Sequence, residues 1–224
     1  IVSIFVNTTQ FNNKEDYKNY TRNFKKDLKD LKSLRINFVY LPHKKDIYKS
    51  KYKTKIRINN KDKILCAKYR KGHFEGVIDV MGRLIKTIKP SKIYMGEKDY
   101  QQLFVIKKYI KKEIKQFKII ACKTVRDKSK LALSSRNFLL KKNELNKARK
   151  ISKDLISFKK KLINFKNVTN LLKIKKNELI KLYNIDIQYL ELRNLINLKK
   201  SIKIKNSKIF IAYYLNKVRL IDNF

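Results

Sequence analysis

The feature that most constrains this fold is the alternation of short apolar runs with helical runs in the first 122 residues. Each apolar run is short and bounded by polar or turn residues, as is typical of a buried strand. Strands are predicted over 1–6, 36–41, 92–95 and 117–122, and helices over 22–34, 74–88 and 100–112. Strands that alternate with helices indicate an α/β fold with a mostly parallel sheet.

The predicted helix over 22–34 carries apolar side chains at helical spacing. Thr21 is a suitable N-cap for this helix. The apolar residues that share one face are Phe24, Leu28, Leu31 and Leu34. Their spacing predicts an amphipathic helix.

The alternation changes after about residue 124. Helices are predicted over 144–162 and 168–183, and strand-like runs over 185–192 and 208–215. Two helices followed by strands are typical of an α+β arrangement. We therefore predict two domains, 1–123 and a smaller α+β domain over 124–224.

The composition is strongly basic, with a formal net charge of +40 and a pI of about 10.2. Taken alone, this charge predicts a polyanion such as nucleic acid as a partner. The lysines are spread along the whole chain, however, and glycine and proline are scarce. We favour the interpretation that an AT-rich genome enriches lysine, asparagine and isoleucine codons, so no specific nucleic-acid partner is expected.

Cysteine use and hydropathy narrow the class further. Cys66 and Cys122 are far apart and make neither a disulfide framework nor a zinc site, so a reducing, cytoplasmic setting is expected. No run of 18 apolar residues predicts a membrane span, and no signal peptide is seen. The chain opens inside a strand pattern without an initiator methionine, so we expect residue 1 to be a cut and not a natural start.

The run Gly96-Glu97-Lys98-Asp99 stands where a short strand ends and a helix begins. In an open α/β sheet this carboxyl edge is where ligands bind, and a helix N-terminus favours phosphate. Lys98 could reach such a phosphate as a point charge, and Gln101 and Gln102 follow in the first helical turn. A plain strand-to-helix turn is the competing interpretation of Gly96. All four glycines lie between 72 and 96, where each is a candidate for a position that a side chain would block.

The run Ser134-Ser135-Arg136 places two hydroxyls and a guanidinium in three consecutive residues. Apolar neighbours on both sides predict that the run is anchored to a core. Such a group is a plausible phosphate clamp, and a helix-capping turn is the alternative.

Considered together, these runs resemble the pantothenate synthetase (pantoate–β-alanine ligase) family. The resemblance extends from residue 3 to residue 223, in the family's order and spacing. The matching runs are 3–11 (SIFVNTTQF), Glu15-Asp16, 70–77 (RKGHFEGV), 96–102 (GEKDYQQ), 131–137 (LALSSRN) and 219–223 (RLIDN).

The resemblance implies a Rossmann-like nucleotidyltransferase domain and a small C-terminal domain that acts as a lid. It also implies an ATP-dependent ligase reaction in two steps, with Mg²⁺ bridging the phosphates. Pantoate and ATP first give pantoyl-adenylate and pyrophosphate; β-alanine then gives pantothenate and AMP. A homodimer without a membrane partner is the implied assembly.

The resemblance also implies roles for individual residues. Lys98, Ser134, Ser135 and Arg136 are the implied catalytic residues. The implied ATP-binding residues are Gly96, Glu97, Lys98, Asp99, Val125, Leu133, Ser134, Ser135 and Arg136. The implied residues for pantoate or β-alanine are Gln10, Gln102, Asn7, Arg70 and His73. No protein metal site is expected.

Four departures from the family pattern stand out. The family has a preceding segment with a His-x-Gly-His-type motif, which lies outside these 224 residues. Thr8 and Lys71 stand where proline is usual, and Lys130 where glycine is usual. Two alternatives to the ligase stay open, a basic RNA-binding module and an inactive remnant of the enzyme.

Overall fold

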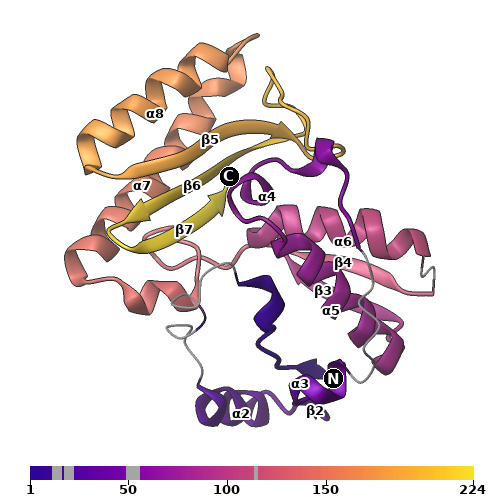
Figure 1. Cartoon of the computed structure of the whole chain (residues 1–224). Helices are drawn as coiled ribbons and strands as arrows, with labels where there is room; N and C mark the ends of the chain where they lie inside the picture. Colours follow the sequence, from indigo (N-terminus) through magenta and orange to yellow (C-terminus); the bar gives the residue numbers. More distant parts are fainter. Residues whose placement is uncertain (12–16, 18–22, 49–55, 114–115) are drawn as a thin grey trace. The chain divides into compact units, whose positions relative to one another are not determined.

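The computed structural model describes residues 1–11, 17, 23–48, 56–113 and 116–224 (Figure 1). These residues form two compact units. The first comprises 1–63, 67–93 and 105–118, and the second comprises 64–66, 94–104 and 119–224. Thr21 and the Glu15-Asp16 pair, which the sequence singled out, lie outside the described residues.

The first unit contains a short parallel pair of strands, β1 (Val2–Ser3) and β2 (Val39–Tyr40). The amide of Val2 donates to the carbonyl of Phe38, and the amide of Ile4 to that of Tyr40. The strands predicted over 1–6 and 36–41 are therefore confirmed in place and direction, although each is two residues long. Short helical segments also belong to this unit: η1 (Thr8–Gln10), α3 (Lys44–Ile47) and η2 (Asn60–Asp62).

Helix α2 (Phe24–Ser33) corrects one expectation. Its N-cap is Asn23, whose side chain accepts from the amide of Lys26. None of its residues is buried, and Phe24 and Leu28 are 45% and 39% exposed. The helix predicted over 22–34 is confirmed, but its N-cap is not Thr21, and its apolar face is not buried in the described part of the chain. The spacing identifies the face that would seek an apolar partner, but it does not supply that partner.

Helix α5 (His73–Ile88) follows α4 (Cys66–Tyr69) and confirms the prediction over 74–88. The apolar side chains that it buries are Phe74, Val77, Ile78, Val80, Leu84 and Ile85. Gly72 caps the helix with φ of 76°, a left-handed conformation that suits glycine. Gly76 lies against η1, because a Cβ there would be 2.9 Å from the carbonyl oxygen of Thr9.

The next elements pass from one unit to the other along the chain. They are β3 (Lys92–Gly96), η3 (Glu97–Asp99), α6 (Tyr100–Glu113) and β4 (Lys118–Cys122). Strands β3 and β4 are hydrogen-bonded neighbours. The predicted inward face of α6 is confirmed, since Leu103, Ile106 and Ile110 are buried. The carboxyl end of β3 and all of η3 belong to the second unit.

The part of the second unit over 124–224 contains helices α7 (Lys142–Lys161) and α8 (Thr169–Tyr183) and an antiparallel sheet, drawn from salmon to yellow in Figure 1. The strands, in sheet order, are β5 (Asp186–Asn194), β6 (Ser207–Leu215) and β7 (Val218–Asn223). Their core includes Ile151, Leu155, Leu179, Ile209 and Ile211, each at most 1% exposed. All of 124–224 lies in this unit, and the boundary near residue 123 remains a prediction.

Candidate active site

The junction between β3 and η3 is the loop that the sequence singled out. Gly96 has an extended conformation, with φ of −69° and ψ of 133°. A Cβ there, or at Gly82, would meet no atom within 4 Å. The expectation that other atoms leave no room for a side chain is therefore confirmed at Gly76. It is wrong for Gly82 and Gly96, where no protein atom would contact a Cβ. Because Gly96 has no side chain, open space remains beside the first helical turn.

Lys98 is the cation of this loop. Its side chain is 21% exposed, and Nζ lies 3.6 Å from a carboxylate oxygen of Asp99. Asp99 is half exposed, so this contact is a weak surface pair. Glu97 points to another cation, because its Oε2 accepts from Nζ of Lys208 at 2.8 Å. Lys98 is thus the member of the loop whose charge faces the pocket described below.

Strand β7 fixes the backbone of this loop through hydrogen bonds. The side-chain amide of Asn223 donates to the carbonyls of Glu97 and Lys98 at 2.8 and 2.9 Å. Asp222 accepts two hydrogen bonds from Arg126, at 2.7 and 2.8 Å, in a bidentate pair. Sequence reasoning gave these residues no role. The signal that could have found them is the matching run 219–223, which places Asp222 and Asn223 in a strand beside two apolar residues.

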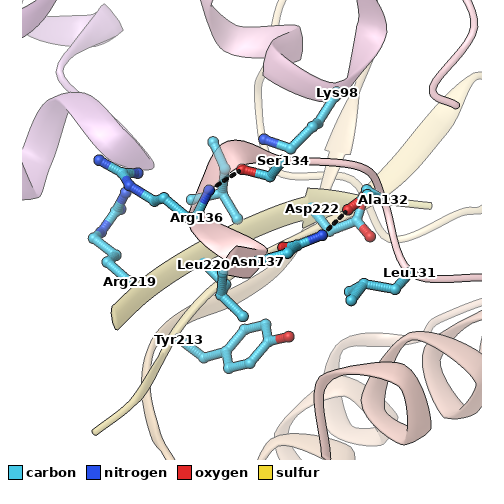
Figure 2. A pocket seen from close by; sticks show the side chains of 11 residues that line it. Lys98, Leu131, Ala132, Ser134, Arg136, Asn137, Tyr213, Arg219, Leu220 and Asp222 are labelled. Carbon is cyan, nitrogen blue, oxygen red and sulfur yellow. Dashed lines mark hydrogen bonds between the residues drawn. The ribbon is translucent and has the colours of Figure 1, made fainter. Parts of the chain in front are cut away.

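Ser134 begins the second predicted phosphate-binding run, at the N-terminus of η4 (Ser135–Leu139). Its Oγ accepts from the amide of Arg136 at 3.3 Å, and Asn137 donates to the carbonyl of Ala132 at 3.0 Å, as the dashed lines in Figure 2 show. The capping turn proposed as an alternative is therefore present. Capping occupies one lone pair of the hydroxyl, which leaves it able to donate to a phosphate.

Lys98 and the Ser134 run line one open pocket (Figure 2). Its lining consists of Lys98, Leu131, Ala132, Ser134, Arg136, Asn137, Tyr213, Arg219, Leu220, Ile221 and Asp222. The lining includes three cationic side chains and a single carboxylate, Asp222, which Arg126 already pairs. Burial and the charge of Asp222 raise the pKa of Tyr213, so its phenol stays neutral. The pocket is suited to an anion.

Val125 and Leu133 lie on the strand-like approach to this pocket. The amide of Leu133 donates to the carbonyl of Val125 at 3.0 Å, and Arg126 and Ala132 form a β-bridge. The two side chains are 67% and 54% exposed. Exposed apolar side chains on a paired backbone are able to contact a nucleobase.

The first unit contains four of the five residues expected to bind pantoate or β-alanine. Asn7 is 1% exposed, and its amide donates to the carbonyl of Gly76 at 3.0 Å. Its Oδ1 accepts from Thr9 and from the hydroxyl of Tyr48 at 2.9 Å. These bonds hold η1 against α5. For Gln10, the structure describes the backbone only.

Arg70 and His73 are in contact in the same unit. Nη1 of Arg70 lies 2.9 Å from Nε2 of His73, which is 7% exposed at the start of α5. A guanidinium only donates, so Nε2 accepts and the imidazole is neutral with its proton on Nδ1.

Gln101 and Gln102, at the start of α6 in the second unit, have different roles. Gln101 is buried, and its amide bonds the amide of Cys66 and the carbonyl of Ile64. It is thus a structural tether. Gln102 is half-buried and is the member of the pair that remains a candidate for binding substrate.

Among the described residues, no group of three or more histidine, cysteine or acidic side chains is placed to hold a metal ion. No helix in the described ranges combines the length and apolarity that a membrane crossing requires.

Comparisons with known proteins place this geometry in a family. The Pantoate-beta-alanine ligase family model matches residues 1–224. A pantothenate synthetase of Francisella tularensis subsp. mediasiatica (strain FSC147) is 39% identical over 228 residues, covering 100% of this chain and 78% of the relative.

Solved structures agree with the family match. A pantoate-beta-alanine ligase from Francisella tularensis, complexed with beta-gamma ATP and beta-alanine, is 37% identical with a TM-score of 0.82, over 100% of this chain and 77% of that one. A pantothenate synthetase from Thermus thermophilus is 28% identical with a TM-score of 0.91, over 99% and 81%. The expected Rossmann-like nucleotidyltransferase fold is thereby confirmed, and the chain belongs to the pantoate-beta-alanine ligase family.

Proposed function

We propose that the chain condenses pantoate with β-alanine at the expense of ATP, through a pantoyl-adenylate. The pantoate carboxylate attacks the α-phosphorus, and the bond to the bridging oxygen breaks to release pyrophosphate. The β-alanine amine then attacks the acyl carbon, loses a proton and displaces AMP. Ligase activity follows from the family, which does not favour a basic RNA-binding module.

The observation that carries this proposal is the pocket where Lys98, Ser134 and Arg136 meet. Pyrophosphate departs with negative charge spread over its oxygens. Cations and hydroxyls fixed around that position stabilise the charge as it develops. A fold that supplies them at the carboxyl end of β3 is suited to adenylate formation.

The remaining roles complete the site. Gly96, Glu97, Lys98 and Asp99 hold the nucleotide from the β3 side, and Val125 and Leu133 contact the base side. Ser134, Ser135 and Arg136 close over the phosphates. Pantoate or β-alanine is held by Gln10, Gln102, Asn7, Arg70 and His73. The domain over 124–224 acts as the lid.

Magnesium enters this scheme with the nucleotide. A site with one nearby carboxylate suits Mg²⁺ that is bound to a nucleotide, because this ion keeps several waters and takes phosphate oxygens together with one or two carboxylates. Asp99, half exposed beside Lys98, is the carboxylate that would hold its water shell. The ion would neutralise charge on the phosphates.

We also propose a cytoplasmic homodimer. Two cysteines without a disulfide, Cys66 and Cys122, suit a reducing compartment that contains ATP. The dimer rests on the family resemblance and is tested by light scattering.

The test of the function compares two lysine variants. Pyrophosphate release is measured with ATP, Mg²⁺ and pantoate. Lys98→Ala is expected to lower kcat/KM by about 100-fold or more, as for loss of a preorganised charge. Lys107→Ala, which removes an exposed lysine of α6, is the matched control and is expected to leave the rate unchanged. Equal rates for both variants would contradict the proposal.

A further inference from the structure

Arg219, in β7, has an unusual set of partners. Its Nε donates to Oε1 of Gln188 at 2.8 Å, and its Nη2 lies 3.4 Å from Sγ of Cys66. Nη1 is buried and has no hydrogen-bond partner in the described part of the chain. Buried polar groups are almost always bonded, so an orphaned guanidinium nitrogen calls for an explanation.

The charge of Arg219 is likewise uncompensated. No described carboxylate forms an ion pair with it, and its neighbours include an amide, a thiol and the phenols of Tyr189 and Tyr214. Burial raises the pKa of Tyr189, so this phenol stays protonated at neutral pH. Arg219 is half-buried, with its Nη1 nitrogen fully buried. A partly desolvated cation without a counter-charge costs folding free energy, unless a ligand supplies the anion.

The position of Arg219 indicates which ligand does so. It lines the same pocket as Lys98, Ser134 and Arg136 (Figure 2). Asp222, the carboxylate of that pocket, is already bound by Arg126 in the bidentate pair. The amide of Gln188 and the thiol of Cys66 hold the guanidinium in place without neutralising it.

We propose that Arg219 is a further ATP-binding residue, whose guanidinium takes the polyphosphate that leaves as pyrophosphate. The inference rests on the proposed function and adds a third cation to Lys98 and Arg136. Gln188 is its positioning residue: a neutral acceptor keeps the positive charge available, whereas a carboxylate there would satisfy it.

The test is calorimetric binding of pyrophosphate, ATP and AMP, each with Mg²⁺, to the whole protein. Arg219→Gln is expected to weaken pyrophosphate and ATP by about 10-fold to 100-fold, as for loss of a charged hydrogen bond. AMP, which lacks the leaving phosphates, is expected to change by less than about twofold. Arg149→Gln is the charge-matched control, since Arg149 pairs with Asp127 outside the pocket, and it is expected to leave all three affinities unchanged.

A second variant keeps the test decisive if Arg219→Gln does not fold. Gln188→Glu retains Arg219 and supplies the missing counter-charge, so pyrophosphate is expected to bind about 10-fold more weakly while thermal stability is kept or raised. The proposed role of Arg219 would be overturned if the folded variants Arg219→Gln and Gln188→Glu bound pyrophosphate as tightly as the wild type. It would also be overturned if Arg149→Gln lost as much pyrophosphate affinity as they do. Neither result would affect the proposed function. Failure of the wild-type protein to bind ATP or pyrophosphate would overturn the proposed function together with this inference.

Discussion

The side-chain amide of Asn223 donates to the carbonyl of Lys98 at 2.9 Å, and to that of Glu97 at 2.8 Å. Asn223 is 3% exposed, so water does not compete for these bonds. The end of the chain therefore fixes the backbone of the loop that carries the candidate phosphate-binding lysine. A displacement of about 1 Å in such a loop is enough to lower catalysis markedly.

Asn223→Ala removes both donors and is expected to raise the KM for ATP by about tenfold, because the carbonyls of Glu97 and Lys98 lose their partners. Asn223→Asp is expected to be worse, since a carboxylate would face the two carbonyls. Steady-state kinetics with varied ATP measure the effect. Ile151→Val, a core change in α7 that costs about 1 kcal/mol, controls for general destabilisation. A KM for ATP that follows stability alone in all three variants would contradict the positioning role.

Lys130 has φ of 70°, a left-handed conformation that is strained for a side chain with a Cβ. Lys130→Gly is expected to stabilise the protein by roughly 0.5–1 kcal/mol, because glycine relieves that strain and keeps the backbone bonds of the turn. Urea unfolding measures the change. Lys128→Gly is the control and is expected to destabilise, since no left-handed conformation is recorded at residue 128. A loss of stability in Lys130→Gly would show that its side chain contributes more than the strain costs.

Gly76 and Gly82 lie in the same helix and are expected to respond to alanine with opposite signs. Gly76→Ala would place a Cβ 2.9 Å from the carbonyl oxygen of Thr9, so a loss of about 1–3 kcal/mol is expected. Gly82→Ala meets open space and gains helix propensity of about 0.5–1 kcal/mol. Denaturant midpoints measure both. Equal effects at the two positions would mean that η1 does not pack on α5 as described.

Asp127 gives the protein an acid-sensitive contact. Burial raises the pKa of its carboxyl, but the bonds from Arg149 and from the amides of Leu131 and Ser129 lower it by more. Because the folded pKa lies below the ordinary value of 3.8, this contribution is present above about pH 4 and is lost as the pH falls through the folded pKa. In Asp127→Asn, the free energy of unfolding is expected to fall less steeply as the pH is lowered below about 4 than it does in the wild type. Parallel plots of the free energy of unfolding against pH for the variant and the wild type would contradict the assignment.

Local patterns predicted much of the fold. The helices over 74–88 and 100–112 are confirmed because they bury a continuous apolar stripe, as Leu103 and Ile106 illustrate. The exposure of the apolar face of α2 could not be predicted, since periodicity does not reveal whether a packing partner is present. Strand β7 was missed because Arg219, Asp222 and Asn223 interrupt its apolar pattern.

Sequence reasoning found some residues of the site and missed others. The runs around Lys98 and Ser134 were visible because their residue types bind phosphate, and the fold places both runs at one pocket. Asn223 and Arg219 act through contacts with residues that are distant in the chain, such as Glu97 and Cys66. Spacing in the sequence contains no signal for such contacts.

The measurement that tests the central claim most directly follows the oxygen atoms of pantoate. The protein is supplied with ATP, Mg²⁺, β-alanine and pantoate whose carboxylate carries heavy oxygen, and the products are analysed by mass spectrometry. Adenylate chemistry predicts that one labelled oxygen appears in AMP, and that pyrophosphate carries none. Label in inorganic phosphate with ADP as the nucleotide product, or AMP without label, would contradict the account.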